Sequence, residues 1–193
     1  MTRRWKTRIV VYGLLLTGLL GTFAYLYWDA TRTKEPQVIF ATTPPDAVEK
    51  MLSMAQVTKD DVVYDLGCGD GRIVIAAVKT FGCRAVGIEL RPELVEQARR
   101  NAAAASVEKL VEIRQGDIFD SDFHDATVVA MYLLPELNLR LRPKLNALKP
   151  GTRVVSFLFG MKGIPANQTA QWEGANGGRT VYLWVTPIPA PVE

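Results

Sequence analysis

The ten residues V-V-Y-D-L-G-C-G-D-G at positions 62–71 carry the strongest fold signal in this chain. Two valines begin a short apolar run typical of a buried strand, and three glycines alternate with other residues directly after it. Glycine permits a tight turn and lets the backbone approach a ligand closely. Because open α/β sheets bind ligands where a strand ends before a helix, the stretch predicts an α/β fold with a ligand over residues 67–71.

The spacing of the glycines indicates what kind of ligand this is. A dinucleotide fingerprint reads G-x-G-x-x-G and receives a pyrophosphate at the N-terminus of the next helix. Here Gly71 comes one position early, and Arg72 stands where the third glycine would be. Asp65, two residues before the first glycine, places a carboxylate beside the ligand. The pattern therefore favours a positively charged cofactor over a dinucleotide.

Strand and helix patterns alternate along the rest of the chain. Short apolar runs predict strands over residues 61–66, 84–90, 110–114, 126–133 and 152–159, and helical spacing predicts helices over 44–55, 71–81, 91–106 and 135–148. Near-continuous apolar strands between helices indicate a parallel sheet covered on both faces. At the end, residues 168–173 and 179–186 flank G-A-N-G-G and predict an antiparallel hairpin.

Two further acidic residues follow the next two predicted strands. Glu89 ends the second strand, where a carboxylate accepts hydrogen bonds from both ribose hydroxyls of a nucleoside. Asp117 follows the third strand in the segment R-Q-G-D-I-F and is placed to accept from an adenine amino group, while Ile118 packs against the ring. Strand–glycine loop, strand–Glu89 and strand–G-D-I in this order form a far more specific pattern than the glycines alone.

This pattern resembles the class I S-adenosylmethionine-dependent methyltransferases over residues 44–186. The resemblance implies a Rossmann-like fold with a seven-stranded, mostly parallel sheet of order 3-2-1-4-5-7-6. It implies that Asp65 and the loop backbone hold the methionine end of S-adenosyl-L-methionine, Glu89 the ribose, and Asp117 with Ile118 the adenine. The residues expected at the cofactor are Thr43, Pro44, Asp65, Gly67, Cys68, Gly69, Gly71, Glu89, Leu90, Asp117 and Ile118.

Three other segments resemble one group within these methyltransferases. The segments T-T-P-P-D-A-V-E-K-M-L, G-I-E-L and L-L-P-E-L-N, together with an apolar N-terminal stretch, are similar to the membrane-anchored protein-lysine methyltransferases of the adenine nucleotide translocase and ATP synthase c-subunit type. This implies in-line transfer of a methyl group to a lysine of a membrane or membrane-associated protein. The segment after the fourth strand faces the methyl group in this fold, so Tyr132, Glu136 and Asn138 are the candidates to hold the amine.

The N-terminus predicts a membrane anchor ahead of this domain. Residues 9–28 contain no charged side chain and are long enough, at roughly 30 Å as a helix, to cross a bilayer. We therefore expect a basic tail at 1–8, a transmembrane helix at 9–28, a linker at 29–43 and the methyltransferase domain at 44–193. The basic tail predicts that the domain lies outside the cytoplasm, but the cofactor is made in the cytoplasm, so we expect a single-pass protein with a cytoplasmic domain.

Composition excludes some partners and leaves other acceptors open. Four basic residues before position 9 account for more than the net charge of +3, so the remainder sums to about −1 and predicts no nucleic-acid partner. The two cysteines are expected to be reduced, and no metal-ligand spacing occurs. Two alternatives to the lysine hypothesis stay open: a methyltransferase for a lipid or quinone, and a silent cofactor-binding membrane module.

Overall fold

The computed structural model describes residues 21–23, 42–174 and 177–191. The chain divides into two units, residues 1–40 and residues 41–193. Of the first unit only residues 21–23 are described, and they are helical. The second unit contains all the helices and strands discussed below.

The transmembrane helix is the part of the predicted fold that is wrong. Within the described ranges, no helix is both long and apolar enough to cross a membrane. Residues 9–20 and 24–28 of the predicted span lie outside the described residues, as do the tail at 1–8 and the linker up to residue 41. An uncharged run of this length is long enough to cross a bilayer as a helix, but its length and lack of charge do not by themselves establish that it is helical.

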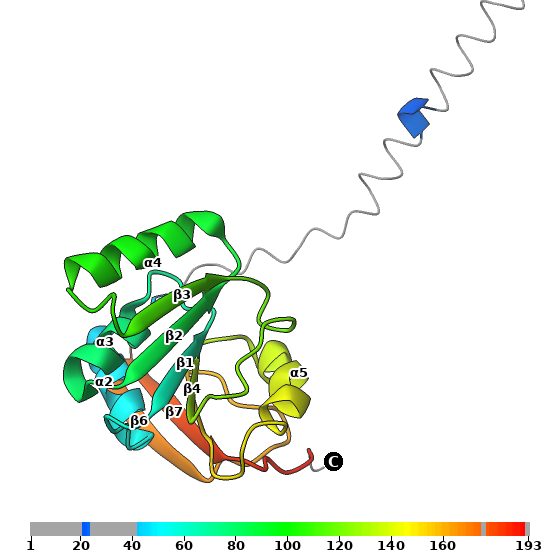
Figure 1. The fold of residues 1–193 in the computed structure, drawn as a ribbon. Helices are drawn as coiled ribbons and strands as arrows, with labels where there is room; N and C mark the ends of the chain where they lie inside the picture. The colour runs from blue at the N-terminus through cyan, green and yellow to red at the C-terminus, as the bar shows by residue number, and fades with distance from the viewer. Residues whose placement is uncertain (1–20, 24–41, 175–176, 192–193) are drawn as a thin grey trace, which may run out of the picture. The chain divides into compact units, whose positions relative to one another are not determined.

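Seven strands form one sheet in the order β3-β2-β1-β4-β5-β7-β6 (Figure 1). The first five strands are parallel, and β7 runs antiparallel between β5 and β6. The strands are β1 Val62–Leu66, β2 Arg84–Glu89, β3 Val111–Gln115, β4 Val128–Met131, β5 Arg153–Phe157, β6 Gln168–Gly174 and β7 Gly177–Val185. This is the strand order that the resemblance implies, and the predicted C-terminal hairpin is confirmed.

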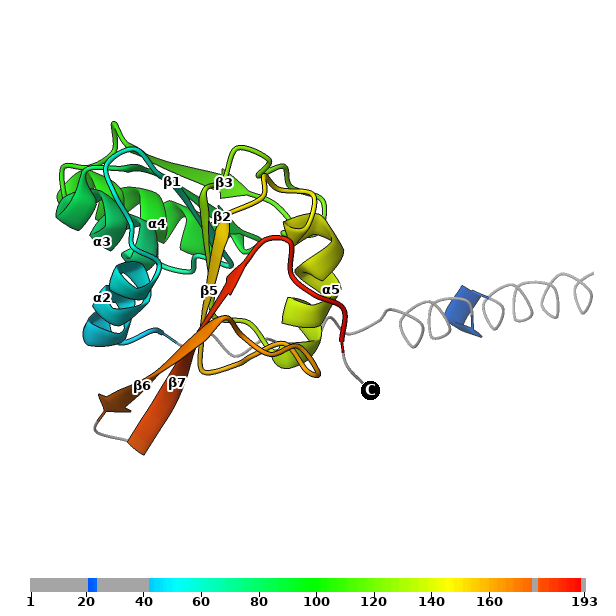
Figure 2. The same ribbon diagram turned by 90° about the horizontal axis from the view of Figure 1, so that it is seen from below.

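Four helices cover the two faces of this sheet. They are α2 Pro45–Met54, α3 Arg72–Phe81, α4 Pro92–Ala104 and α5 Pro135–Leu145. Seen from below, α2, α3 and α4 lie on one face and α5 on the other (Figure 2). Three of the four begin with a proline, whose missing N–H has no partner in a first helical turn anyway.

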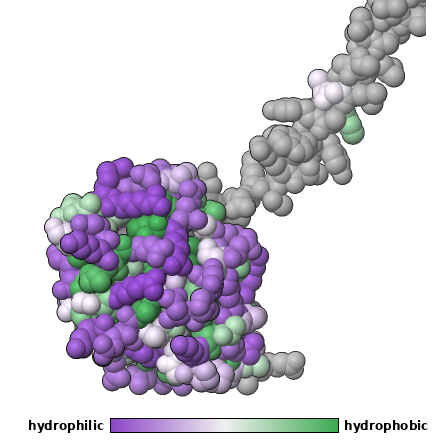
Figure 3. Space-filling view, viewed as in Figure 1, coloured by the Kyte–Doolittle hydropathy of each residue, from purple (hydrophilic) through white to green (hydrophobic). Residues whose placement is uncertain are grey.

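Each face of the sheet has its own hydrophobic core, because successive side chains of a strand point to opposite faces. Val63, Ala130 and Val155 belong to the cluster that packs against α2, α3 and α4. Tyr64, Met131 and Val154 belong to the cluster that includes Leu141 and Leu145 of α5. Large exposed hydrophobic side chains in the described part of this unit are few, namely Leu90, Leu110 and Leu134. The face shown in Figure 3 is accordingly hydrophilic over most of its area, with smaller hydrophobic areas between.

The carboxyl ends of the five parallel strands meet along one edge of the sheet. The glycine loop follows β1, Glu89 ends β2, Asp117 follows β3 and Tyr132 follows β4. The β6–β7 hairpin extends away from the rest of the domain (Figure 2). Residues separated by up to 65 positions in the sequence, from Gly67 to Tyr132, therefore share one edge, which is where open α/β sheets place their ligands.

Candidate active site

The glycine loop after β1 has a backbone that only glycine adopts without strain. Gly67, Gly69 and Gly71 have φ angles of 81°, 55° and 82°, in the left-handed region. The N–H groups of Gly67 and Cys68 both donate to the Ile88 carbonyl of β2 at 2.9 Å, so the loop is fastened to the neighbouring strand. Its remaining backbone is thereby fixed in position for a ligand at the edge of the sheet.

Cys68 takes part in this loop through its backbone, since its side chain is buried against β2. A Cβ at Gly87 would lie only 2.6 Å from the Cys68 sulfur, so Gly87 provides the space that the thiol occupies. Burial is the main factor that raises the pKa of the Cys68 thiol, and the Asp65 carboxylate adds to it. The thiol therefore stays protonated, and both described cysteines are free, as expected.

Asp65 is a buried carboxylate to which the described residues supply no partner. Its side chain is 3% exposed, and no hydrogen bond or ion pair to it occurs among those residues. Burial, followed by repulsion from Glu89 and Asp70, raises the pKa of Asp65 to about 8. A buried carboxylate in this condition fits a cationic ligand group, because an opposite charge removes the penalty of ionisation. The ammonium and sulfonium groups of S-adenosylmethionine are such cations, so Asp65 fits the cofactor that the sequence predicts.

Glu89 joins the ends of β2 and the glycine loop. It is 6% exposed, and its two oxygens accept hydrogen bonds from the Gly69 N–H at 2.9 Å and from the Arg91 N–H at 3.0 Å. A carboxylate held through both oxygens has a fixed direction, and each oxygen retains lone-pair capacity for a further donor. The diol of a ribose supplies two such donors, so the predicted ribose role is compatible with the geometry.

The residues expected around the adenine are more accessible. Asp117 is exposed, and its Oδ1 accepts from the Phe119 N–H at 2.8 Å. Ile118 is half-buried, whereas Leu90 is 51% exposed at the end of β2. Exposed apolar side chains beside a carboxylate are what an adenine ring requires from a binding surface, since it has an apolar face and a polar edge.

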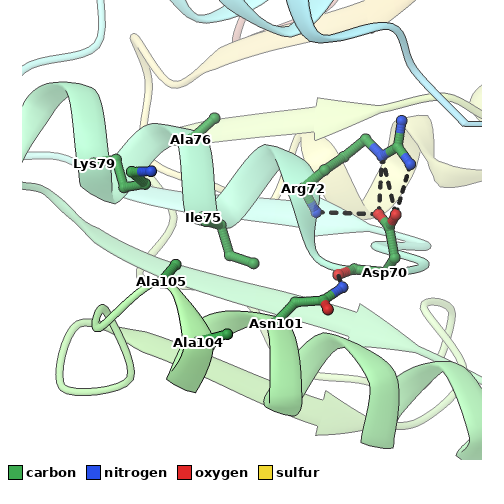
Figure 4. A pocket seen from close by; sticks show the side chains of 8 residues that line it. All are labelled: Asp70, Arg72, Ile75, Ala76, Lys79, Asn101, Ala104 and Ala105. Atoms are coloured by element: carbon green, nitrogen blue, oxygen red, sulfur yellow. Dashed lines mark hydrogen bonds and ion pairs between the residues drawn. The ribbon is translucent and has the colours of Figure 1, made fainter.

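Thr43 is linked to the glycine loop through Arg72, which the sequence marks only as a departure from the dinucleotide pattern, and Pro44 follows it at the start of α2. The Arg72 guanidinium donates to the Thr43 carbonyl at 2.9 Å and forms an ion pair with Asp70 at 2.6 Å. The Asn101 amide of α4 donates to the Asp70 carbonyl at 2.9 Å. Figure 4 shows Asp70, Arg72 and Asn101 at one end of a groove of about 500 Å³ between α3 and α4, lined further by Ile75, Ala76, Lys79, Ala104 and Ala105.

The three candidate amine-binding residues do not form one group. Asn138 is fully buried, and its amide donates to the carbonyls of Phe159 at 3.0 Å and Gly160 at 3.3 Å. It therefore holds the turn after β5. Glu136 is exposed, and no hydrogen bond or ion pair to it occurs in the described part of the chain. Tyr132 packs against the rings of Phe157 and Phe159, with centroids 5.2 and 6.0 Å away.

The aromatic cluster around Tyr132 was not predicted from the sequence. Tyr132 follows β4, Phe157 ends β5 and Trp172 lies on β6, with the Phe157 and Trp172 centroids 5.5 Å apart. Tyr132, Phe159 and Trp172 are each half-buried and so leave part of their rings accessible. The only sequence feature that pointed to this cluster was the segment F-L-F at 157–159, but this apolar segment predicts no more than a strand. The positive φ of 67° at Leu158, which turns the chain there, is not visible in the sequence.

The sheet order, the glycine loop and the paired acids Asp65 and Glu89 define a class I S-adenosylmethionine-dependent methyltransferase. Residues 65–168 match the model of the ANTKMT methyltransferase domain family, and the chain belongs to that family. No group of three or more His, Cys, Asp or Glu side chains that could hold a metal ion occurs among the described residues.

Several known proteins are similar to this chain. A protein-lysine N-methyltransferase of Saccharolobus islandicus is 45% identical over 78% of this chain and 94% of that protein. The human lysine N-methyltransferase of the ATP synthase c-subunit is 34% identical over 77% of this chain and 66% of that protein. A Salinibacter ruber crystal structure described as an RNA methyltransferase with S-adenosyl-L-homocysteine is 49% identical, with a TM-score of 0.73, over 79% of this chain and 98% of that chain.

Proposed function

We propose that this enzyme N-methylates lysine side chains of a protein. The observation that carries the proposal is the 45% identity to a protein-lysine N-methyltransferase, which extends over 94% of that protein. The family match and the relative named for the ATP synthase c-subunit support the same acceptor chemistry.

The residues of this chain have distinct tasks in such a reaction. S-adenosylmethionine supplies the activated methyl group, and the protein supplies alignment and electrostatics. Asp65 neutralises the positive charge at the methionine end, and Glu89 fixes the ribose. Tyr132, at the carboxyl end of β4, would lie on the side of the site where the acceptor enters.

The acceptor amine must be neutral to attack. Free lysine has a pKa near 10.4, so most of it is protonated at neutral pH. The half-buried rings of Tyr132, Phe159 and Trp172 offer the apolar surroundings that lower an amine pKa and favour the neutral form. The π faces of the same rings also attract an ammonium group, which helps to bind the lysine and partly opposes the lowering of its pKa. We therefore place the acceptor lysine beside this aromatic cluster.

RNA is the second candidate acceptor, because the Salinibacter structure is described as an RNA methyltransferase. Electrostatics disfavour it here: beyond residue 8 the chain carries a net charge of about −1, and nucleic-acid affinity depends chiefly on cationic side chains that contact phosphates. Lysine in a protein remains the acceptor that the observations support better.

One labelling experiment distinguishes the acceptors. The full chain is incubated with methyl-tritiated S-adenosylmethionine and a cell extract that includes membranes, and protein, RNA and lipid are then separated. We expect label in protein, recovered as methyl-lysine after acid hydrolysis. A Glu89→Gln variant provides the background. Label confined to RNA or to the lipid extract would replace the lysine proposal, and the absence of label above background from all three fractions would favour a silent module.

A further inference from the structure

The basic residues of α5 contact the loop that follows β3. Lys144 donates to the Phe119 carbonyl at 2.8 Å and to the Ile118 carbonyl at 3.4 Å, and its ammonium lies 4.9 Å from the centre of the Phe123 ring. One turn earlier, the Arg140 guanidinium lies 3.8 Å above the centre of the Phe119 ring. Positions four apart on a helix share a face, so both cations meet the same loop.

The loop held in this way is the one expected to bind the adenine. Its backbone is already a compact turn, since the Asp117 carbonyl accepts from both the N–H and the hydroxyl of Ser121, at 2.8 and 2.7 Å. The Gly116 N–H donates to the Glu89 carbonyl at 3.0 Å, which joins the start of the loop to the ribose-binding residue. Further along the loop, the α5 cations make their contacts.

These contacts explain why cations occupy this helix face. A charged donor forms stronger hydrogen bonds to carbonyls than a neutral one, and an arginine stacked on a ring adds a cation–π attraction. Two peptide carbonyls and one ring of a short segment are thereby held in place. The Ile118 side chain and the Asp117 carboxylate belong to that same segment, so their positions depend on it.

We propose that Arg140 and Lys144 are positioning residues for the adenine end of S-adenosylmethionine. From α5 they hold residues 117–119 so that Ile118 contacts the adenine ring and Asp117 accepts from its amino group. The inference concerns cofactor binding alone, and it stands whichever acceptor the enzyme methylates.

The test measures binding of S-adenosylhomocysteine to the full chain by calorimetry. Lys144→Met removes both hydrogen bonds, and Arg140→Gln removes the stacked guanidinium. We expect each to weaken binding by about three- to tenfold, because partly exposed charged contacts contribute modest free energies. Lys144→Arg, which keeps a cationic donor, should recover most of the affinity.

Arg142→Gln is the matched control. Arg142 lies on the same helix and carries the same charge, but it donates to the Pro189 carbonyl at 2.7 Å, in the C-terminal segment. Its substitution should leave S-adenosylhomocysteine affinity within about twofold of wild type. Equal weakening by Arg142→Gln, or unchanged affinity in both Lys144→Met and Arg140→Gln, would overturn the proposal.

A second ligand separates positioning from general loosening of the fold. S-inosylhomocysteine carries an oxygen in place of the adenine amino group, so an enzyme with Asp117 correctly positioned binds S-adenosylhomocysteine more tightly. We expect the ratio of the two Kd values to become smaller in Lys144→Met. A variant that merely destabilises the domain lowers both affinities equally, and an unchanged preference would contradict the proposal.

Discussion

Asp65 is a buried carboxyl group whose pKa lies well above its usual value. Its pKa of about 8 against 3.8 in the unfolded chain means that the native state holds a proton through this interval and the unfolded state does not. The contribution of this group to the free energy of unfolding therefore falls as pH rises from about 4 to 8, by up to about 1.4 kcal/mol per pH unit.

An Asp65→Asn substitution tests that carboxylate in two ways. Without ligand, the variant should lose less stability than wild type between pH 5 and 8, as measured by urea denaturation, because the amide does not titrate. With ligand, it should bind S-adenosylmethionine at least about tenfold more weakly, since the cation loses its counter-charge. Wild-type affinity in the variant would remove Asp65 from the methionine end.

Cofactor binding itself should release a proton from wild-type Asp65 below pH 8. A bound cation favours the carboxylate, so affinity should rise with pH by up to about tenfold per unit until the pKa is passed. Calorimetry in two buffers of different ionisation enthalpy counts the released protons. Asp65→Asn, which has no proton to release, supplies the reference.

Helix α5 also holds the turn after β5, because the side chain of Asn138 reaches that turn from the helix. Sequence spacing correctly placed the helix, and it made Asn138 a candidate to hold the amine. The structure shows a side chain with no exposed surface whose amide serves two backbone carbonyls. Local periodicity contains no information about which distant carbonyls a buried amide meets, so this contact could not be predicted.

An Asn138→Leu substitution should disturb the acceptor side of the site more than the cofactor side. It removes the Asn138 donor from the Gly160 carbonyl, whereas the Phe159 carbonyl keeps the Ser156 hydroxyl at 2.7 Å. The loss of one such donor costs about 1–3 kcal/mol of stability. We expect a lower melting temperature and a KM for the acceptor that rises more than the Kd for S-adenosylhomocysteine.

Asn146→Leu is the control for that variant. Asn146 also lies at α5, and its amide bonds the backbone of Ile188 in both directions, at 2.9 and 2.7 Å. Its loss should lower the melting temperature without raising the acceptor KM. Equal effects of the two variants on the acceptor KM would assign Asn138 to stability alone.

In the molecule as a whole, the candidate site is assembled from both halves of the domain. Most of the expected cofactor residues come from β1 to β3 and the loops after them, where a strand is followed by glycines or an acid, so the sequence could suggest them, and their roles stay predictions. The aromatic cluster comes from β4, β5 and the C-terminal hairpin. Trp172 joins this cluster because β7 places β6 beside the parallel strands. That strand order was predicted from the resemblance and not from any residue pattern.

A Trp172 substitution tests whether the hairpin serves the acceptor. Trp172→Leu removes a ring that lies 5.5 Å from Phe157 and should raise the acceptor KM several-fold, by roughly the 0.5–2 kcal/mol of a lost cation–π and apolar contact. Trp172→Phe should retain most activity. The ring contact of Trp172 is to Phe157 of β5, whereas the expected cofactor residues Asp65, Glu89 and Asp117 lie at β1 to β3. The Kd for S-adenosylhomocysteine should therefore stay unchanged in both variants, and a change there would instead indicate a general loss of structure.

The hydrogen bond from Arg72 to the Thr43 carbonyl links the segment ahead of α2 to the glycine loop, because the same guanidinium forms an ion pair with Asp70 in that loop. One side chain therefore joins two segments that are far apart in the sequence. A substitution at Arg72 should release both segments together.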